Sequence, residues 1–273
     1  MVEILVHFVA PALVGVLIGV ASGLLGIGGG TVMVPIFRLA FGMSATMSTA
    51  TSLFAIIPTS ISGAISHAKG KTCIPALGIA AGLGGACMSP IGVWLAQLSP
   101  DWLVMLAAAL IIGYSAINMF KKAFKLRPAG QPAAGVDAAA PTADDSSLSR
   151  KQLLQGAAIG LVAGLASGYV GVGGGFIMVP LMLSIIGIPM RKASGTSLIA
   201  VMILAIPGVI EQGIIGNINY LAGIAIVIGT IPGAVIGARL VTKVPERTLR
   251  LLFGCFLIVA AVMLVLNEVG IFG

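Results

Sequence analysis

The sequence predicts an all-α integral membrane protein with two inverted repeats of about five transmembrane segments each and with helices broken at two glycine motifs. Hydrophobic residues make up 58% of the 273 positions and charged residues only 8%, whereas a soluble domain is about 25% charged. Apolar stretches of roughly the 20 residues that cross a bilayer recur along the chain. A glycine-rich motif also occurs twice at a constant separation. These three observations predict the fold class.

The chain repeats itself in two similar halves. The stretch Ser22–Pro35 and the stretch Ser167–Pro180 share nine of fourteen residues, 145 positions apart and without a gap. The same separation relates Thr51 and Ser52 to Thr196 and Ser197. Such an internal repeat indicates duplication of one structural unit.

A segment of different composition separates the halves. Residues 126–149 are rich in Ala, Pro, Gly, Asp and Ser, which is typical of a solvent-exposed linker. We therefore expect a first transmembrane repeat at 1–125, a linker at 126–149 and a second transmembrane repeat at 150–273.

Each half contains five apolar segments. They fall at about 4–24, 31–43, 46–66, 73–97 and 102–122, and at about 152–170, 176–190, 194–214, 218–240 and 248–267. The second segment of each half is too short to span a bilayer, begins at a triple glycine and contains Pro35 or Pro180. Broken helices at corresponding positions of two repeats indicate the binding site of a transporter.

An odd number of segments per repeat inserts the second copy upside down. The basic residues fit this arrangement if the linker is cytoplasmic, because cytoplasmic loops are rich in Lys and Arg. The basic residues that then fall inside include Lys69, Lys71, Lys121, Lys122, Lys125, Arg127, Arg150, Lys151, Arg191, Lys192, Lys243, Arg247 and Arg250. We expect a multi-pass protein of the cytoplasmic membrane with both termini outside. Four segments per half, with the short ones re-entrant, is the alternative.

The glycine motifs predict an anion-binding cradle. A helix that restarts at Thr31 or at Phe176 exposes unpaired N–H groups and the positive end of its dipole, which bind anions without a charged side chain. The cradle residues are Gly28, Gly29, Gly30 and Thr31 in the first half and Gly173, Gly174, Gly175 and Phe176 in the second. The alternative is that these glycines only allow close helix packing. A nucleotide-binding loop does not fit, because no acidic residue follows about 20 positions later.

The duplicated S-G-x-x-G-x-G-G-G followed by V-P, with T-S-L about twenty residues on, resembles the TauE/SafE family of sulfite and sulfonate exporters. The resemblance covers both halves, essentially everything outside the linker. It implies a membrane permease for small sulfur-containing anions such as sulfite or organosulfonates. The substrate and the direction of transport stay open.

Hydroxyl and charged side chains complete the candidate site. Thr51, Ser52, Thr196 and Ser197 lie at matching positions in apolar surroundings, where hydroxyls either donate to an oxyanion or hold helices together. Four residues are candidates for gating or for attracting charge: Pro35, Pro180, Arg38 and Arg239. Arg38 falls on the outer side against the positive-inside rule, and misplaced charges are functional hypotheses. His67, beside Lys69, is expected at the membrane interface.

Several classes of function are excluded or disfavoured. The segments hold no nucleophile paired with a base, so we expect no enzyme, and no cofactor or metal site is expected. The net charge of +7 serves membrane topology and not nucleic-acid binding. The expected partners are a small anionic substrate, the lipid bilayer and, as an open possibility, a second copy in a homodimer. We expect alternating-access transport, and an anion channel or a permease for another small ion is the alternative.

Overall fold

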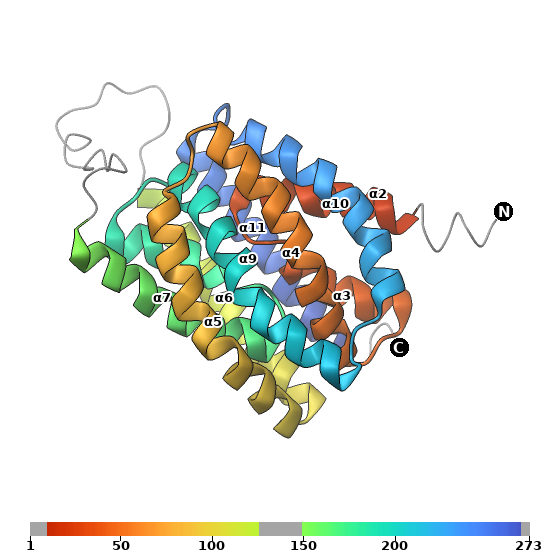
Figure 1. The fold of residues 1–273 in the computed structure, drawn as a ribbon. Coiled ribbons are helices and arrows are strands. Elements are labelled where there is room, and N and C mark those ends of the chain that lie inside the picture. The colour runs from red at the N-terminus through yellow and green to blue at the C-terminus, as the bar shows by residue number, and fades with distance from the viewer. Residues whose placement is uncertain (1–9, 126–148, 269–273) are drawn as a thin grey trace.

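The computed structural model describes residues 10–125 and 149–268, and all regular structure in these ranges is helical. The helices of the first half are α2 (Ala10–Leu25), α3 (Gly30–Phe41), α4 (Ala45–Lys69), α5 (Pro75–Leu98) and α6 (Asp101–Lys125). Those of the second half are α7 (Arg150–Val170), α8 (Gly175–Leu181) continued by the π-helix η3 (Met182–Ile186), α9 (Met190–Ile215), α10 (Tyr220–Leu240) and α11 (Glu246–Glu268). Figure 1 follows them along the chain.

Each predicted apolar segment coincides with a helix, and the two short segments begin one residue earlier than predicted, at Gly30 and Gly175. Six helices have the length and composition to cross a membrane: Ala45–Lys69, Pro75–Leu98, Asp101–Lys121, Arg150–Val170, Met190–Ile215 and Tyr220–Leu240. The predicted fold class, an all-α membrane protein, is therefore confirmed. The linker residues 126–148 and the start of the first segment, before Ala10, lie outside the described residues.

Glycines let two pairs of helices pack at very short separation. In the pair α2–α10, Gly15, Gly19 and Gly23 face Ile226, Thr230 and Ala234 in turn, so the two helices run parallel. In the pair α5–α7, Gly160 of α7 faces the Ala81 carbonyl of α5. The face of α5 that packs on α7 carries Gly84, Gly85 and Gly92. Close backbone approach is the main source of helix association in a bilayer, because lipid supplies no hydrophobic driving force.

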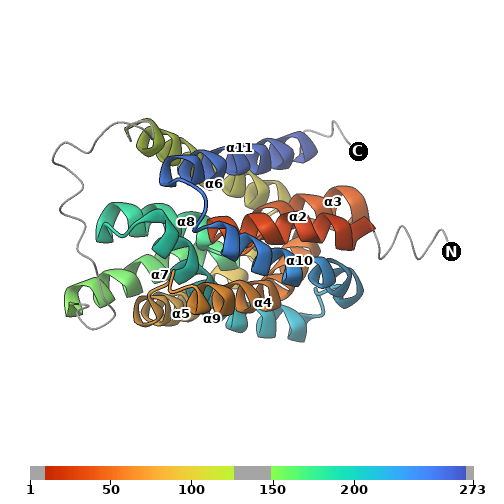
Figure 2. The same cartoon turned by 90° about the horizontal axis from the view of Figure 1, so that it is seen from above.

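Four other helices form the centre and one edge of the molecule. Helices α4 and α9 pack on each other and hold most of the buried hydroxyl residues. Helices α6 and α11 lie side by side along one edge of the molecule (Figure 2), where Gly254 packs on the ring of Phe120.

Positions 145 apart make matching contacts between helices. The hydroxyl of Thr51 accepts from the Asn219 amide at 3.0 Å, and the hydroxyl of Thr196 accepts from the Ile74 amide at 2.9 Å. Asp101 accepts from the amide of Ala45 and Glu246 accepts from the amide of Met190, at 3.4 and 3.3 Å. Each of these bonds satisfies an amide at or next to the start of a helix.

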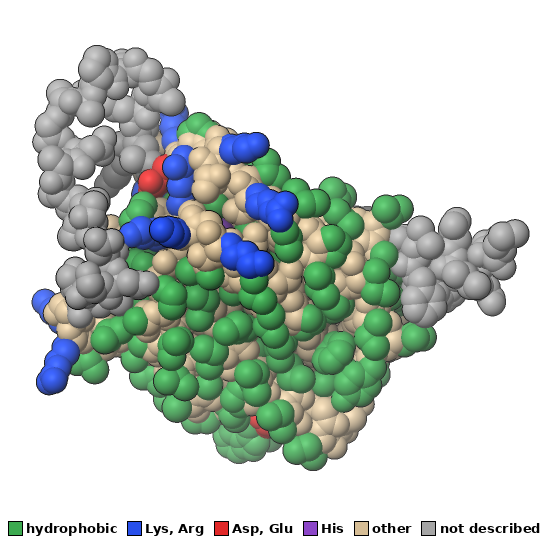
Figure 3. Space-filling view, turned by 45° about the horizontal axis from the view of Figure 1, so that its top comes forward, with side chains coloured by type: hydrophobic (Ala, Val, Ile, Leu, Met, Phe, Trp, Pro, Cys, Tyr) green, Lys and Arg blue, Asp and Glu red, His purple; other side chains and the backbone are tan. Residues whose placement is uncertain are grey.

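Basic side chains gather at one end of the molecule, above a belt of hydrophobic ones (Figure 3). Two contacts bring the loops that carry them together. Arg191 donates to the Val244 carbonyl at 2.9 Å, which joins the start of α9 to the loop between α10 and α11. Gly195 packs on the Thr72 carbonyl, which joins α9 to the loop between α4 and α5.

Candidate functional site

Both glycine motifs are breaks between helices, as the sequence predicts. Between α2 and α3, Gly28 and Gly29 have φ of 81° and 87°, and between α7 and α8, Gly173 and Gly174 have φ of 87° and 56°. These are left-handed conformations, which cost a residue with a side chain about 1–2 kcal/mol. Glycine is therefore required here by the backbone itself.

The two breaks lie against each other inside the helix bundle. Gly30 is packed on the Val172 carbonyl, and its counterpart Gly175 is packed on the Gly26 carbonyl. Ile56, halfway along α4, lies close to both breaks: a β-carbon at Gly28 would stand 3.3 Å from its Cγ2, and one at Gly173 would stand 2.7 Å from its Cδ1. Helices α3 and α8 thus begin side by side in the middle of the molecule.

The first break leaves a run of backbone amides without acceptors. The Gly26 amide donates to the Ser22 carbonyl at 2.8 Å, and the next amides that donate are those of Val32 and Met33, to the Gly29 carbonyl. Among the described residues, the amides of residues 27–31 have no hydrogen-bond acceptor. Unpaired amides of this kind at a helix start are donors for an anion.

The second break has a similar run of backbone amides without acceptors, except that one amide within it makes a hydrogen bond. The Gly171 amide donates to the Ser167 carbonyl at 2.7 Å, and the Gly175 amide donates to the Gly173 carbonyl at 2.5 Å. The following turn is closed by bonds from Ile177 and Met178 to the Gly174 carbonyl.

Several buried hydroxyl groups have no partner, and some of them lie next to the breaks. Seven serine and threonine hydroxyls are fully buried and make no hydrogen bond within the ranges described: Ser22, Thr31, Ser48, Ser52, Ser60, Ser89 and Ser167. The Oγ of Ser60 is 3.5 Å from the place of a β-carbon at Gly28, and the Cβ of Ser22 is 3.6 Å from that place at Gly29. Ser167 has the same relation to Gly174, at 3.5 Å. Buried hydroxyls normally have a partner, so this cluster is unusual.

Three of the four predicted hydroxyl residues on α4 and α9 hold the scaffold. Ser197 donates towards the carbonyls of Gly26 and Ser194, at 2.7 and 2.8 Å, and so fixes the first break to α9. Thr51 and Thr196 accept the helix-start bonds described above. Ser52 belongs to the unpartnered group.

The predicted prolines and the phenylalanine lie within the short helices. Pro35 is buried inside α3, which continues as a regular α-helix to Phe41. Pro180 lies inside α8, which turns into a π-helix from Met182, and Ser184 donates to the Pro180 carbonyl at 2.5 Å. Phe176 is fully buried next to Gly175.

The charged candidates lie at helix ends, away from the breaks. Arg38 is half-buried in the last turn of α3, and Arg239 is exposed in the last turn of α10. A cation at a helix C-terminus is favourable with respect to the helix dipole. The structure therefore does not bring these arginines to the glycine residues.

His67 lies two residues before the end of α4, and its side chain is completely buried; its expected depth at the membrane interface stays a prediction. Its Nε2 lies 2.7 Å from the Gly23 carbonyl oxygen and its Nδ1 lies 2.8 Å from Thr72 Oγ1. Since a carbonyl oxygen only accepts, Nε2 is the donor. His67 thus ties α4 to α2 three residues before the first break.

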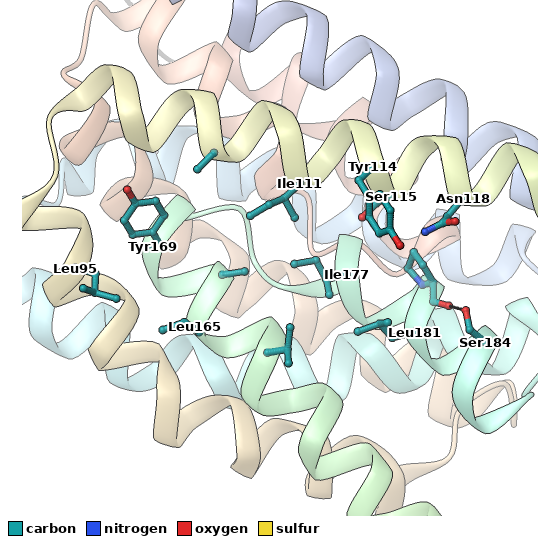
Figure 4. A pocket seen from close by; sticks show the side chains of 14 residues that line it. Leu95, Ile111, Tyr114, Ser115, Asn118, Leu165, Tyr169, Ile177, Leu181 and Ser184 are labelled. Atoms are coloured by element: carbon teal, nitrogen blue, oxygen red, sulfur yellow. Dashed lines mark hydrogen bonds between the residues drawn. The ribbon is translucent and has the colours of Figure 1, made fainter.

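An apolar groove of about 820 Å³ lies elsewhere, between α6 and the helices α7 and α8 (Figure 4). Aliphatic side chains such as Ile111, Leu165 and Ile177 line its middle. Tyr169 lies at one end, and Tyr114, Ser115, Asn118 and Ser184 lie at the other. None of its lining residues is cationic, so the groove suits hydrocarbon better than an anion.

Comparison with known proteins gives a family match over most of the chain. The model of the family described as "Sulfite exporter TauE/SafE" matches residues 11–264. The chain belongs to the TauE/SafE family. Curated proteins similar to this TauE/SafE chain include two probable membrane transporter proteins of Bacillus subtilis (strain 168). YunE is 28% identical over 97% of this chain and 99% of its own length, and YdhB is 28% identical over 87% and 92%.

Another relative of this TauE/SafE chain is a probable membrane transporter protein of Haemophilus influenzae, 29% identical over 93% of this chain and 97% of its own length. No solved structure matches the chain. The family and these relatives are described as membrane transporters, and the chain is a multi-pass membrane protein of that class.

Proposed function

We propose that this protein is a secondary transporter of small sulfur-containing anions, such as sulfite or organosulfonates, that works by alternating access. The observation that carries the proposal is the meeting of the two glycine breaks inside the bundle, with unpaired amides and unpartnered buried hydroxyls around them. Amide and hydroxyl donors replace the water of an oxyanion without introducing a buried cation. The description of the family as a sulfite exporter supports this substrate class.

We also propose that the two halves are inverted copies and that transport is a rocking of one half against the other. The matching contacts of positions 145 apart support the first statement, because Thr51–Asn219 and Thr196–Ile74 exchange partners between the halves. Broken helices at the repeat interface are the usual site of such transporters. The left-handed glycines and Pro35 and Pro180 provide positions at which the short helices can change direction.

The proposed orientation places the basic end of the molecule in the cytoplasm. The loops that the contacts described above bring together, and the helix ends next to them, carry Lys69, Lys71, Arg191, Lys192 and Lys243. Such basic residues are typical of the cytoplasmic side. The protein then lies in the cytoplasmic membrane with the linker inside and both termini outside. Cysteines introduced singly at Lys71 and Gly216 test this, since only the second is then labelled by an impermeant maleimide added to intact cells.

Uptake of radiolabelled sulfite into proteoliposomes tests the function. The proposal predicts uptake that saturates with sulfite concentration and responds to an imposed ion gradient. Ohmic conductance without saturation would identify an anion channel instead. Absence of flux for sulfite, methanesulfonate and thiosulfate alike, with folded protein, would contradict the proposal. The homodimer stays a prediction, which the mass of the detergent-solubilised protein tests.

A further inference from the structure

The two glycine breaks are equivalent in sequence but differ in chemistry. Thr31, whose buried hydroxyl has no partner in the described part of the chain, corresponds to Phe176 in the second half. Ser60, equally unpartnered, corresponds to Ala205. At these two positions the first half carries a hydroxyl group and the second half an apolar side chain.

The backbone donors differ in the same direction. At the second break the Gly175 amide is used by the Gly173 carbonyl, whereas the corresponding Gly30 amide has no acceptor among the described residues. Helix α3 is a regular α-helix of 12 residues, while α8 is α-helical for only 7 residues before it turns into a π-helix.

Two hydroxyls outside the short helices point to a ligand at the first break. Ser60 comes from α4 and Ser22 from α2, and both side chains are completely buried and unpartnered. Their atoms lie 3.5 and 3.6 Å from the places where β-carbons at Gly28 and Gly29 would stand. A serine in a helix ordinarily bonds to its own backbone when it has no other partner. These two do not, and an unmade bond of a buried hydroxyl is costly.

We propose that the transported anion binds at the first break alone, where the hydroxyls of Ser22, Ser60 and Thr31 donate to it together with the amides of residues 27–31. The second break then forms the opposite, less polar wall of the site. This inference rests on the proposed function and adds which half holds the anion and which serines bind it. It predicts that equivalent residues of the two halves contribute unequally.

Ser22→Ala and Ser167→Ala are matched variants, because the two serines occupy the same position of the repeated motif and have the same burial. Binding of sulfite to the purified full-length protein is measured by isothermal titration calorimetry. We expect Ser22→Ala and Ser60→Ala each to weaken sulfite binding about tenfold or more, as the loss of a hydrogen bond to a charged group does. Ser167→Ala is expected to change the dissociation constant less than about twofold.

The Tm of thermal unfolding, measured with and without sulfite, is a second test of the same variants. Since none of the three serines has a partner among the described residues, their replacement is expected to leave the Tm of the sulfite-free protein unchanged or raised. Added sulfite is expected to raise the Tm of wild type and Ser167→Ala more than that of Ser22→Ala and Ser60→Ala.

Equal weakening by Ser22→Ala and Ser167→Ala, or no weakening by Ser22→Ala and Ser60→Ala, would overturn the one-sided site while leaving the anion-transport function intact. A lowered Tm of sulfite-free Ser22→Ala, with unchanged affinity of its folded fraction, would also overturn it, because the serine would then be structural. Wild-type protein that binds neither sulfite nor methanesulfonate would overturn both proposals.

Discussion

Replacing Gly28 by alanine adds a single methyl group at a crowded point of the first break. Gly28 has φ of 81°, so alanine there costs about 1–2 kcal/mol of left-handed strain. The methyl carbon would stand 2.9 Å from Cγ1 of Val201 and 3.3 Å from Cγ2 of Ile56, and such overpacking adds about 1–3 kcal/mol. It would also lie 3.5 Å from the hydroxyl oxygen of Ser60, one of the donors proposed for the anion.

Gly42→Ala is the matched control for this prediction. Gly42 ends α3 with φ of 60°, and no described residue beyond its chain neighbours lies within 4 Å of the place of its β-carbon. It therefore brings similar left-handed strain, about 1–2 kcal/mol, without crowding and outside the site. We expect both variants to have a lowered Tm, with the larger decrease for Gly28→Ala.

The assay is sulfite uptake into proteoliposomes, normalised to the amount of folded, monodisperse protein. Gly42→Ala is expected to transport at the wild-type rate and Gly28→Ala at less than about a tenth of it, since a loss of 1.4 kcal/mol in binding is tenfold. Wild-type uptake by folded Gly28→Ala, or equal loss of uptake in both variants, would refute the reasoning that anions bind at this break.

Three further predictions concern the scaffold. Thr51→Val removes the acceptor of the Asn219 amide, and Thr196→Val removes that of the Ile74 amide, each at a helix start. Each variant should therefore lower the unfolding free energy by about 1–3 kcal/mol. An unchanged Tm in both would contradict the role given to these hydroxyls. Gly160→Leu should abolish stable folding, because Gly160 packs on the Ala81 carbonyl and a leucine there would force α5 and α7 apart. Gly113→Leu should be tolerated, since no described residue lies within 4 Å of its β-carbon place; equal yields of folded protein would refute this. Asp101→Asn and Glu246→Gln weaken acceptors for the amides of Ala45 and Met190 and should each cost about 0.3–1 kcal/mol, which urea or thermal melts of the two variants would measure.

The course of the helices follows from composition and repetition. Apolar segments separated by charged or glycine-rich residues can only be helices in a bilayer, because each backbone group must be satisfied within its own segment. The two triple glycines marked the breaks, since no other residue adopts two successive left-handed conformations so easily. Both features are local, and the sequence predicts them to within one residue at Gly30 and Gly175.

The partners of individual hydroxyls do not follow from the sequence. Thr51 and Ser52 are neighbours in the same motif, yet one accepts from a helix start and the other has no partner. Which of them is used depends on the helix that packs opposite, and this is decided by tertiary structure. Ser22 and Ser167 could have been predicted as site residues, because they are the first residues of the duplicated motif. Ser60 could not, because the corresponding residue of the second half is Ala205.

The burial of His67 and the π-helix after Pro180 both depend on the neighbouring parts of the fold. The sequence places His67 two residues from Lys69 and so close to the helix end, but α2 approaches closely enough for its Gly23 carbonyl to accept from the ring. Pro180 and Pro35 stand at equivalent positions, and only the former is followed by a π-helix. Proline removes one amide donor in both, so the difference comes from what surrounds each helix.

A crystal structure with bound thiosulfate, located by the anomalous scattering of its sulfur atoms, tests the central claim most directly. The account predicts a peak at the first break, with oxygens at hydrogen-bond distance, about 2.7–3.2 Å, from amides of residues 27–31 and from the hydroxyls of Ser22 and Ser60. A peak confined to the groove between α6 and α7, or to the exposed arginines, with these amides and hydroxyls still unpaired, would contradict it.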